Sequence, residues 1–294
     1  MLYPQSRRFV EAAALTPKVF EPGFDIDESR RQARELAAGL PREDVEQVLD
    51  VDADGVRCRL YRPHDAREGT LVHLHGGGFV FHDIDVHDAA ARRLANRSEV
   101  TVLSVDYRRP PEHRFPAAPD DVDTVLAWLA REGAAYELEA PLYVHGDSAG
   151  ANLALVAALR HPGRFRALAL VYPFLDPEGA FESYRTAADG FDPREAQWYW
   201  QQYAATPADL EHPDLAPLRS DRLWALPPTL VTTAEHDPLR DEGEHLAALL
   251  ADAGVAVVAT RYLGQVHGFW RHPEVFDAAE PMTRQVAAFL GMYP

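Results

Sequence analysis

The sequence has a single cysteine, Cys58, among its 294 residues. An intramolecular disulfide is therefore excluded, and the fold must be held together by its core. Cys58 lies in the alternating run from Val56 to Tyr61, a pattern that is typical of a β-strand. We interpret this thiol as a small buried side chain and not as a nucleophile.

Long apolar runs are also missing. No stretch approaches the length of about 18 apolar residues that a membrane-spanning helix needs. The first ten residues contain Arg7 and Arg8, but no apolar segment or cleavage site of a signal peptide follows. We therefore expect a cytoplasmic protein without a membrane span.

Positive charge is scarce, with 29 Lys and Arg residues against 46 Asp and Glu residues and a formal net charge of −17. Nucleic acids and anionic membranes both bind basic surfaces, so this balance argues against them as partners. The His, Asp and Glu residues are too dispersed for a zinc motif, and no H-E-x-x-H segment occurs. We expect neither a metal nor an organic cofactor.

Strand-like and helix-like segments alternate from about residue 70 onward. We expect helices near 86–97 and 118–132, and strands near 70–75, 100–106, 142–144, 167–172, 228–234 and 257–262. This alternation predicts an α/β fold with a mostly parallel sheet and helices on both faces. Residues 44–63 predict a β-hairpin with its turn at 52–55.

The segment Gly146-Asp147-Ser148-Ala149-Gly150 follows the apolar run Leu142–Val144. A G-x-S-x-G segment between a strand and a helix holds its serine in a strained turn. We expect Ser148 to project its hydroxyl into solvent as a nucleophile, with the helix N-terminus pointing toward it.

A second glycine-rich segment, His75-Gly76-Gly77-Gly78-Phe79, also follows an apolar run. Three consecutive glycines are compatible with a flexible turn, but in hydrolases an H-G-G-G loop supplies N–H groups to an oxyanion hole. Together with the serine segment, it predicts Gly77, Gly78 and Ala149 as oxyanion-hole donors.

A nucleophilic serine needs a histidine as base and an acidic residue that orients the histidine. In hydrolases with a G-x-S-x-G turn, the acidic residue follows the serine in the sequence, and the histidine follows the acidic residue. Asp237 follows the apolar run 228–234, and His267 follows the run 257–262. Both therefore lie past the carboxyl ends of strands, where open α/β sheets place their sites. The sequence predicts Ser148, Asp237 and His267 as catalytic residues.

Other titratable residues compete for these roles. Asp241 and Glu235 lie close to Asp237, but Asp241 is expected to cap a helix or pair locally. His75 is expected to brace the glycine loop, while His145 and His236 have no free catalytic position. Asp147 is expected to be structural and to point away from the pocket, because Ser148 occupies the apex of the turn.

Taken together, these segments resemble the hormone-sensitive-lipase family of α/β-hydrolases, the bacterial family IV esterases of the GDSAG type. The resemblance covers most of the chain from about residue 70 and lies in His75–Val80, Asp106–Asp121, Gly146–Ala154, Tyr172-Pro173, Leu226–Gly243 and His267–Phe269. It departs from the family pattern at Arg109-Pro110 and at Ala151, none of which belongs to the reacting groups. It implies an α/β-hydrolase fold with a helical cap, a small-molecule ester as substrate, and a monomer or a homodimer. It also implies that the segment from Asp106 to His113 supports the glycine loop.

The resemblance further divides the chain into N-terminal cap helices, residues 1–41, and a catalytic domain, residues 42–294, with a cap insert at about 179–217. Residues 1–41 predict helices broken at Pro17 and Pro22, and the aromatic-rich residues 181–203 predict helix. A roofed pocket predicts carboxylic esters with short acyl chains as substrates. Two alternatives stay open: an amidase or deacetylase acting on a small secondary metabolite, and a ligand receptor without turnover. The receptors that resemble this family lack the catalytic histidine, whereas this chain has His267.

Overall fold

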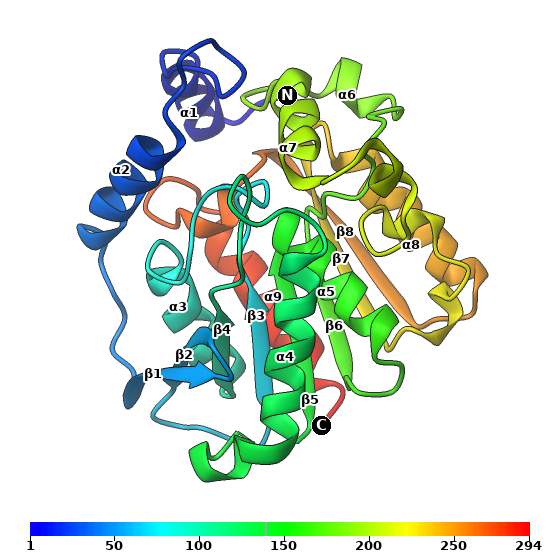
Figure 1. Cartoon of the computed structure of the whole chain (residues 1–294). Helices are drawn as coiled ribbons and strands as arrows, with labels where there is room; N and C mark the ends of the chain where they lie inside the picture. Colours follow the sequence, from blue (N-terminus) through cyan, green and yellow to red (C-terminus); the bar gives the residue numbers. More distant parts are fainter. Residues whose placement is uncertain (139) are drawn as a thin grey trace.

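The computed structural model describes residues 1–138 and 140–294, and a single mixed β-sheet forms its centre (Figure 1). The eight strands are ordered β1-β2-β4-β3-β5-β6-β7-β8 across the sheet. The first two pairings, β1 with β2 and β2 with β4, are antiparallel, and all the others are parallel. The strands span Gln47–Ala53 (β1), Val56–Arg62 (β2), Thr70–Leu74 (β3), Thr101–Val105 (β4), Leu142–Asp147 (β5), Ala167–Val171 (β6), Thr229–His236 (β7) and Val257–Val266 (β8).

Helices connect the strands and cover both faces of the sheet (Figure 1). The α-helices span Pro4–Ala13 (α1), Ile26–Ala38 (α2), Asp88–Ser98 (α3), Ala117–Glu132 (α4), Ala149–Arg160 (α5), Ser183–Thr186 (α6), Pro193–Tyr203 (α7), Arg240–Asp252 (α8) and Ala279–Gly291 (α9). Short 3₁₀ turns lie at Gly133–Tyr136, Pro207–Glu211, Pro217–Arg219, Leu223–Ala225 and Phe269–Arg271. Within the described residues no helix combines the length and the apolar character that crossing a membrane requires.

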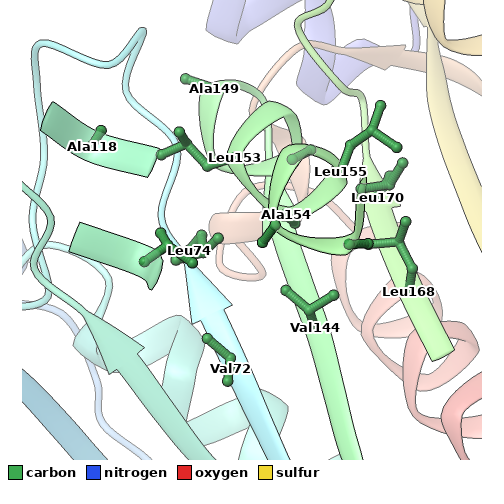
Figure 2. Packing of buried hydrophobic residues seen from close by; sticks show 14 of the residues in the cluster. Val72, Leu74, Ala118, Val144, Ala149, Leu153, Ala154, Leu155, Leu168 and Leu170 are labelled. Atoms are coloured by element: carbon green, nitrogen blue, oxygen red, sulfur yellow. The ribbon is translucent and has the colours of Figure 1, made fainter. Parts of the chain in front are cut away.

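Alternating residues of the central strands point to opposite faces of the sheet and pack in two apolar layers, one on each side. Val72 and Val144 pack in the same layer as α4, α5 and α8, whereas Leu71 and Tyr143 pack in the layer of α3 and α9. Figure 2 shows the first layer, in which Leu153 and neighbouring residues of α5 lie against β3, β5 and β6. All residues of β3, β5 and β6 are buried, as expected for interior strands of a parallel sheet.

The predicted α/β fold is confirmed, and the hairpin at 44–63 is confirmed as β1 and β2. The two expected helices at 86–97 and 118–132 are confirmed as α3 and α4, with ends shifted by one or two residues. The expectation of helix across 181–203 is wrong in part, because α6 ends at Thr186 and α7 begins at Pro193. Gly190 has a φ of +79° between them, and Asp192 then caps α7 by accepting a hydrogen bond from the backbone N–H of Arg194.

Candidate active site

Ser148 lies between β5 and α5 in a backbone conformation that most residues avoid, with φ 55° and ψ −120°. Two glycines make this turn possible. A Cβ on Gly146 would lie 2.2 Å from the carbonyl oxygen of Gly150, and a Cβ on Gly150 would lie 2.0 Å from that of Leu74. The strained strand-to-helix turn predicted from the sequence is confirmed.

Three residues far apart in the sequence form a chain of hydrogen bonds at this turn. The Nε2 atom of His267 lies 3.0 Å from the hydroxyl oxygen of Ser148, and its Nδ1 atom lies 2.7 Å from Oδ2 of Asp237. Asp237 is fully buried, and its other oxygen accepts a hydrogen bond of 2.9 Å from the backbone N–H of Leu239. The carboxylate is therefore fixed on both sides, and it fixes the ring orientation of His267.

The Ser148 side chain is covered and does not project into solvent, so the expectation of an exposed hydroxyl is wrong. Only 6% of the residue is accessible. Aromatic rings surround its histidine partner: the ring centre of Tyr172 lies 4.5 Å from that of His267, and the ring centre of Phe191 lies 4.9 Å from it. These two rings pack against the imidazole and leave it partly exposed, with 19% of the side chain accessible.

The glycine loop after β3 is a fixed turn and not a flexible one. The carbonyl oxygen of Gly77 accepts hydrogen bonds from the N–H groups of Val80 and Phe81, at 3.1 and 2.8 Å. Gly77 and Gly78 have φ values of +126° and +58°, and a Cβ on Gly77 would lie 2.2 Å from the carbonyl oxygen of Phe81. Only glycine fits this backbone, and among the described residues no acceptor binds the N–H groups of Gly77 or Gly78.

Buried side chains hold this loop from behind. The Oδ1 atom of Asp147 accepts a hydrogen bond of 2.8 Å from the N–H of Gly76. His75 places its Nδ1 atom 2.9 Å from the carbonyl oxygen of Gly76 and stacks on the ring of Tyr107, whose hydroxyl donates to the His75 carbonyl at 2.6 Å. The expectation that His75 braces the loop is confirmed.

Burial sets the charge of these groups. It lowers the pKa of His75 to about 3, so the imidazole is neutral at pH 7. Burial also raises the pKa of the Asp147 carboxyl above its ordinary value. The thiol of Cys58 is buried as expected, and burial raises its pKa, so it is not a reactive thiolate.

The competing residues have partners elsewhere. Asp241 accepts a hydrogen bond of 2.9 Å from the N–H of Ser183, and Glu235 accepts one of 2.6 Å from the N–H of Gly264. His236 lies 2.8 Å from Asp189, and His145 lies 3.0 Å from His73. The structure therefore brings Asp237, and not its neighbours, to the histidine that contacts Ser148.

The comparisons with known proteins agree with this arrangement. A family model described as the α/β hydrolase fold matches residues 71–271. An ethyl acetate hydrolase from Pseudomonas putida is 33% identical to this chain, with 93% of this chain and 92% of the relative covered. An arylesterase from Saccharolobus solfataricus is 31% identical, with 99% and 97% covered. The chain belongs to the α/β-hydrolase fold family.

Solved structures of this family extend the similarity to the whole chain. A hyperthermophilic esterase from the archaeon Pyrobaculum calidifontis is 34% identical and superposes with a TM-score of 0.87, with 99% of this chain and 98% of that chain covered. The resemblance to the hormone-sensitive-lipase type of esterase, predicted from the sequence, is confirmed.

Sequence reasoning missed several residues that shape the site. The hydrogen bond between Asp147 and the glycine loop joins residues 71 positions apart, and no local sequence pattern indicates it. Phe191 and Tyr172 against His267 were equally hidden, although both lie in segments that the sequence had singled out. Their signal was the aromatic content of 181–203 and the Tyr172-Pro173 pair.

Proposed function

We propose that this protein hydrolyses carboxylic esters with short acyl chains through an acyl-enzyme on Ser148. Carboxylic ester hydrolysis is the reaction of its relatives, which include an ethyl acetate hydrolase and a carboxylic ester hydrolase from Mycobacterium tuberculosis. The observation that carries the assignment of residues is the hydrogen-bonded chain from Asp237 through His267 to Ser148.

In the first half of the reaction, the Ser148 hydroxyl oxygen attacks the ester carbonyl carbon. The Nε2 atom of His267 takes the hydroxyl proton, since it already lies 3.0 Å from that oxygen. Asp237 holds the Nδ1–H of the imidazole and stabilises the imidazolium that forms.

The negative charge that develops on the carbonyl oxygen needs donors. We assign the backbone N–H groups of Gly77, Gly78 and Ala149 to this oxyanion hole. The Gly77 and Gly78 amides have no internal acceptor among the described residues, which leaves them available. Each such donor contributes roughly 3–4 kcal/mol to the stabilisation of the transition state.

Collapse of the tetrahedral intermediate expels the alcohol, which receives its proton from His267. A water molecule then attacks the acyl-enzyme, with His267 again acting as base, and releases the acid and free Ser148. All of these steps use side chains and backbone groups of this chain.

We assign residues 1–41 and 179–217 to a cap over this site. Lys18 pairs with Glu195 at 3.3 Å, and the guanidinium of Arg194 lies 4.2 Å from the ring centre of Phe20. The two segments therefore contact each other at α7, and Phe191 reaches His267 from the same side. A roof this close to the reacting atoms favours acyl groups from acetyl to roughly hexanoyl, because longer chains would overpack the pocket.

Amide hydrolysis is the alternative that uses the same groups, and a receptor without turnover is a third. A panel of p-nitrophenyl esters of increasing acyl length, with the matching anilides, separates all three. We expect the highest kcat/KM for a short ester and little anilide cleavage. Turnover of anilides alone would favour the amidase, and binding without turnover would favour the receptor.

Labelling with a fluorophosphonate followed by peptide mass spectrometry tests the nucleophile directly. We expect the mass shift on the peptide that contains Ser148 and none on the Ser148→Ala variant. A label on another residue would disprove the assignment.

We further propose a cytoplasmic monomer or homodimer acting on small-molecule esters. The single buried cysteine and the acidic composition support this proposal, and light scattering would measure the mass.

A further inference from the structure

Behind the Ser148 turn lies a buried cluster of polar side chains that the reaction above does not use. His73 of β3, His87 at the start of α3, and His145 and Asp147 of β5 are each at most 2% exposed. Burying such groups is costly unless their polar atoms find partners. Spacings of 14 and 60 residues along the chain hid this grouping from the sequence.

Three atoms of the cluster face one another at unusual separations. The Nε2 atom of His73 lies 3.4 Å from Nδ1 of His87, which lies 3.7 Å from Oδ1 of Asp147. The three ligand atoms all lie within 4.8 Å of one another. Good N–H hydrogen bonds fall at about 2.7–3.2 Å, so both contacts are long for that purpose. Two ligands of a tetrahedral zinc ion, each about 2.0–2.1 Å from the metal, lie about 3.3 Å apart.

We propose that His73 Nε2, His87 Nδ1 and Asp147 Oδ1 bind a divalent transition-metal ion of the zinc type. Two imidazoles and one carboxylate form a ligand set that suits zinc and its first-row neighbours. The ion joins β3, α3 and β5 behind the active site and has a structural role. The proposal is independent of the hydrolytic function, since the ion takes no part in the ester chemistry.

The charges around Asp147 also favour a bound cation. Among the described residues no Lys or Arg forms an ion pair with Asp147, and a divalent ion supplies positive charge next to this buried carboxylate.

A neighbouring residue orients the first ligand. The Nδ1 atom of His73 lies 3.0 Å from Nδ1 of His145, the residue that pairs with it in register on the adjacent strand. When Nδ1–H of His73 donates this bond, the lone pair of its Nε2 atom points toward His87 and Asp147. Metal-bound histidines generally have such a partner on their other nitrogen.

The site is coupled to the glycine loop through one oxygen. Oδ1 of Asp147 also accepts the hydrogen bond from Gly76 N–H. An ion on this oxygen fixes the position of the carboxylate, and with it the start of the loop that carries Gly77 and Gly78. The expected consequence is a higher melting temperature of the loaded protein.

The test begins with the full-length wild-type protein, expressed in media supplemented with Zn²⁺ or Co²⁺ because the buried ligands are best loaded during folding. Elemental analysis after desalting measures the metal content, and visible absorption of the Co²⁺ form reports tetrahedral coordination. We expect about one ion per chain, Co²⁺ d–d bands, and a higher melting temperature than that of protein refolded with a chelator. Wild-type protein with only trace metal and no such shift would overturn the proposal, and the cluster would then be a neutral hydrogen-bonded network.

Two variants locate the ion. His87→Gln removes a ligand and should abolish retention of the ion, whereas His145→Gln removes only the orienting partner and should weaken affinity about 10–100-fold. His64→Gln is the matched control, because His64 is exposed and pairs with Asp44 on the surface. Equal metal loss in the control, or full metal retention in a folded His87→Gln protein, would contradict the site.

Discussion

Two regions near Ser148 differ in how they are packed: in one the backbone leaves no room for an added carbon atom, and in the other aromatic rings make the contacts. We call residues 75–79 and 146–150 the floor and residues 181–203 the roof. In the floor, a Cβ on Gly146 or Gly150 would meet backbone atoms at 2.2 and 2.0 Å. In the roof, Tyr203 stacks on Phe79 at a ring separation of 3.8 Å, and Phe191 contacts His267 at 4.9 Å.

This difference separates two tasks. Charge stabilisation needs donors held in one geometry, and backbone atoms locked by hydrogen bonds and tight turns provide it. Selection among acyl groups needs only a surface of suitable shape, and apolar and aromatic side chains provide that. We therefore expect floor substitutions to change the rate for every ester, and roof substitutions to change which ester is preferred.

The largest loss of activity is expected from a substitution at Ser148, in the middle of the floor. Ser148→Ala removes the nucleophile, and kcat should fall by about 10⁶, with a residual rate from binding and the oxyanion hole. Stopped-flow release of p-nitrophenol should also lose its burst. Ser220→Ala, outside the floor, is the control and should keep wild-type turnover. A burst that persists in Ser148→Ala would show that another residue forms the acyl-enzyme.

The next effect concerns the acid. Asp237→Asn should lower kcat by about 10⁴, because the amide favours the wrong tautomer of His267. Asp241→Asn is the matched control, since Asp241 binds Ser183 and Arg240 instead. Steady-state kinetics of both variants on one short ester give the ranking. A larger loss in Asp241→Asn than in Asp237→Asn would show that Asp237 is not the carboxylate that orients His267.

A smaller effect arises where floor and roof meet. A Cβ on Gly78 would lie 2.4 Å from the ring of Tyr199, and the φ of +58° adds strain. Gly78→Ala should displace an oxyanion donor and lower kcat by up to about 10²–10³. Gly163→Ala is the control, because it has a similar φ of +75° but nothing within 4 Å of the added carbon.

The double variant Gly78→Ala/Tyr199→Ala separates the two causes. Removing the ring relieves the clash and should recover part of the rate, whereas the backbone strain stays. If the double variant is no faster than Gly78→Ala alone, Tyr199 is not the obstacle, and the floor acts independently of the roof.

The sequence predicted the floor better than the roof for a physical reason. A strained turn demands particular residues at adjacent positions, so Gly146 to Gly150 and the three glycines after His75 were visible as local patterns. Asp237 and His267 were found from their places after strands and their order in the chain.

The roof carries no such local demand. Residues 181–203 were expected to be helical, but Gly190 and Asp192 interrupt the helix, and the contact of Phe191 with His267 depends on the path of that irregular segment. Ser148 is only 6% accessible, so the expectation of an exposed hydroxyl failed at a residue whose burial depends on long-range packing. Long-range pairs such as Asp147 with Gly76 were hidden because the two residues lie 71 positions apart and leave no local pattern in the sequence.

The smallest effect on rate, and the most specific, tests the roof itself. Tyr199 lies over Gly78, and its ring contacts Phe191 and Phe81 at centre separations of 6.3 and 6.0 Å. Tyr199→Ala opens space above the oxyanion hole without touching the hydrogen bonds of His267. Each additional methylene that fits this space contributes about 0.8 kcal/mol, or roughly fourfold in kcat/KM. The preferred acyl length should therefore increase by a few carbons, while kcat for the acetyl ester changes little.

Phe181→Ala is the control, because Phe181 contacts His245 and not the site. The kcat/KM profile over p-nitrophenyl esters from acetyl to dodecanoyl measures the shift. An unchanged profile in Tyr199→Ala, with full rates for short esters, would remove this ring from the acyl pocket.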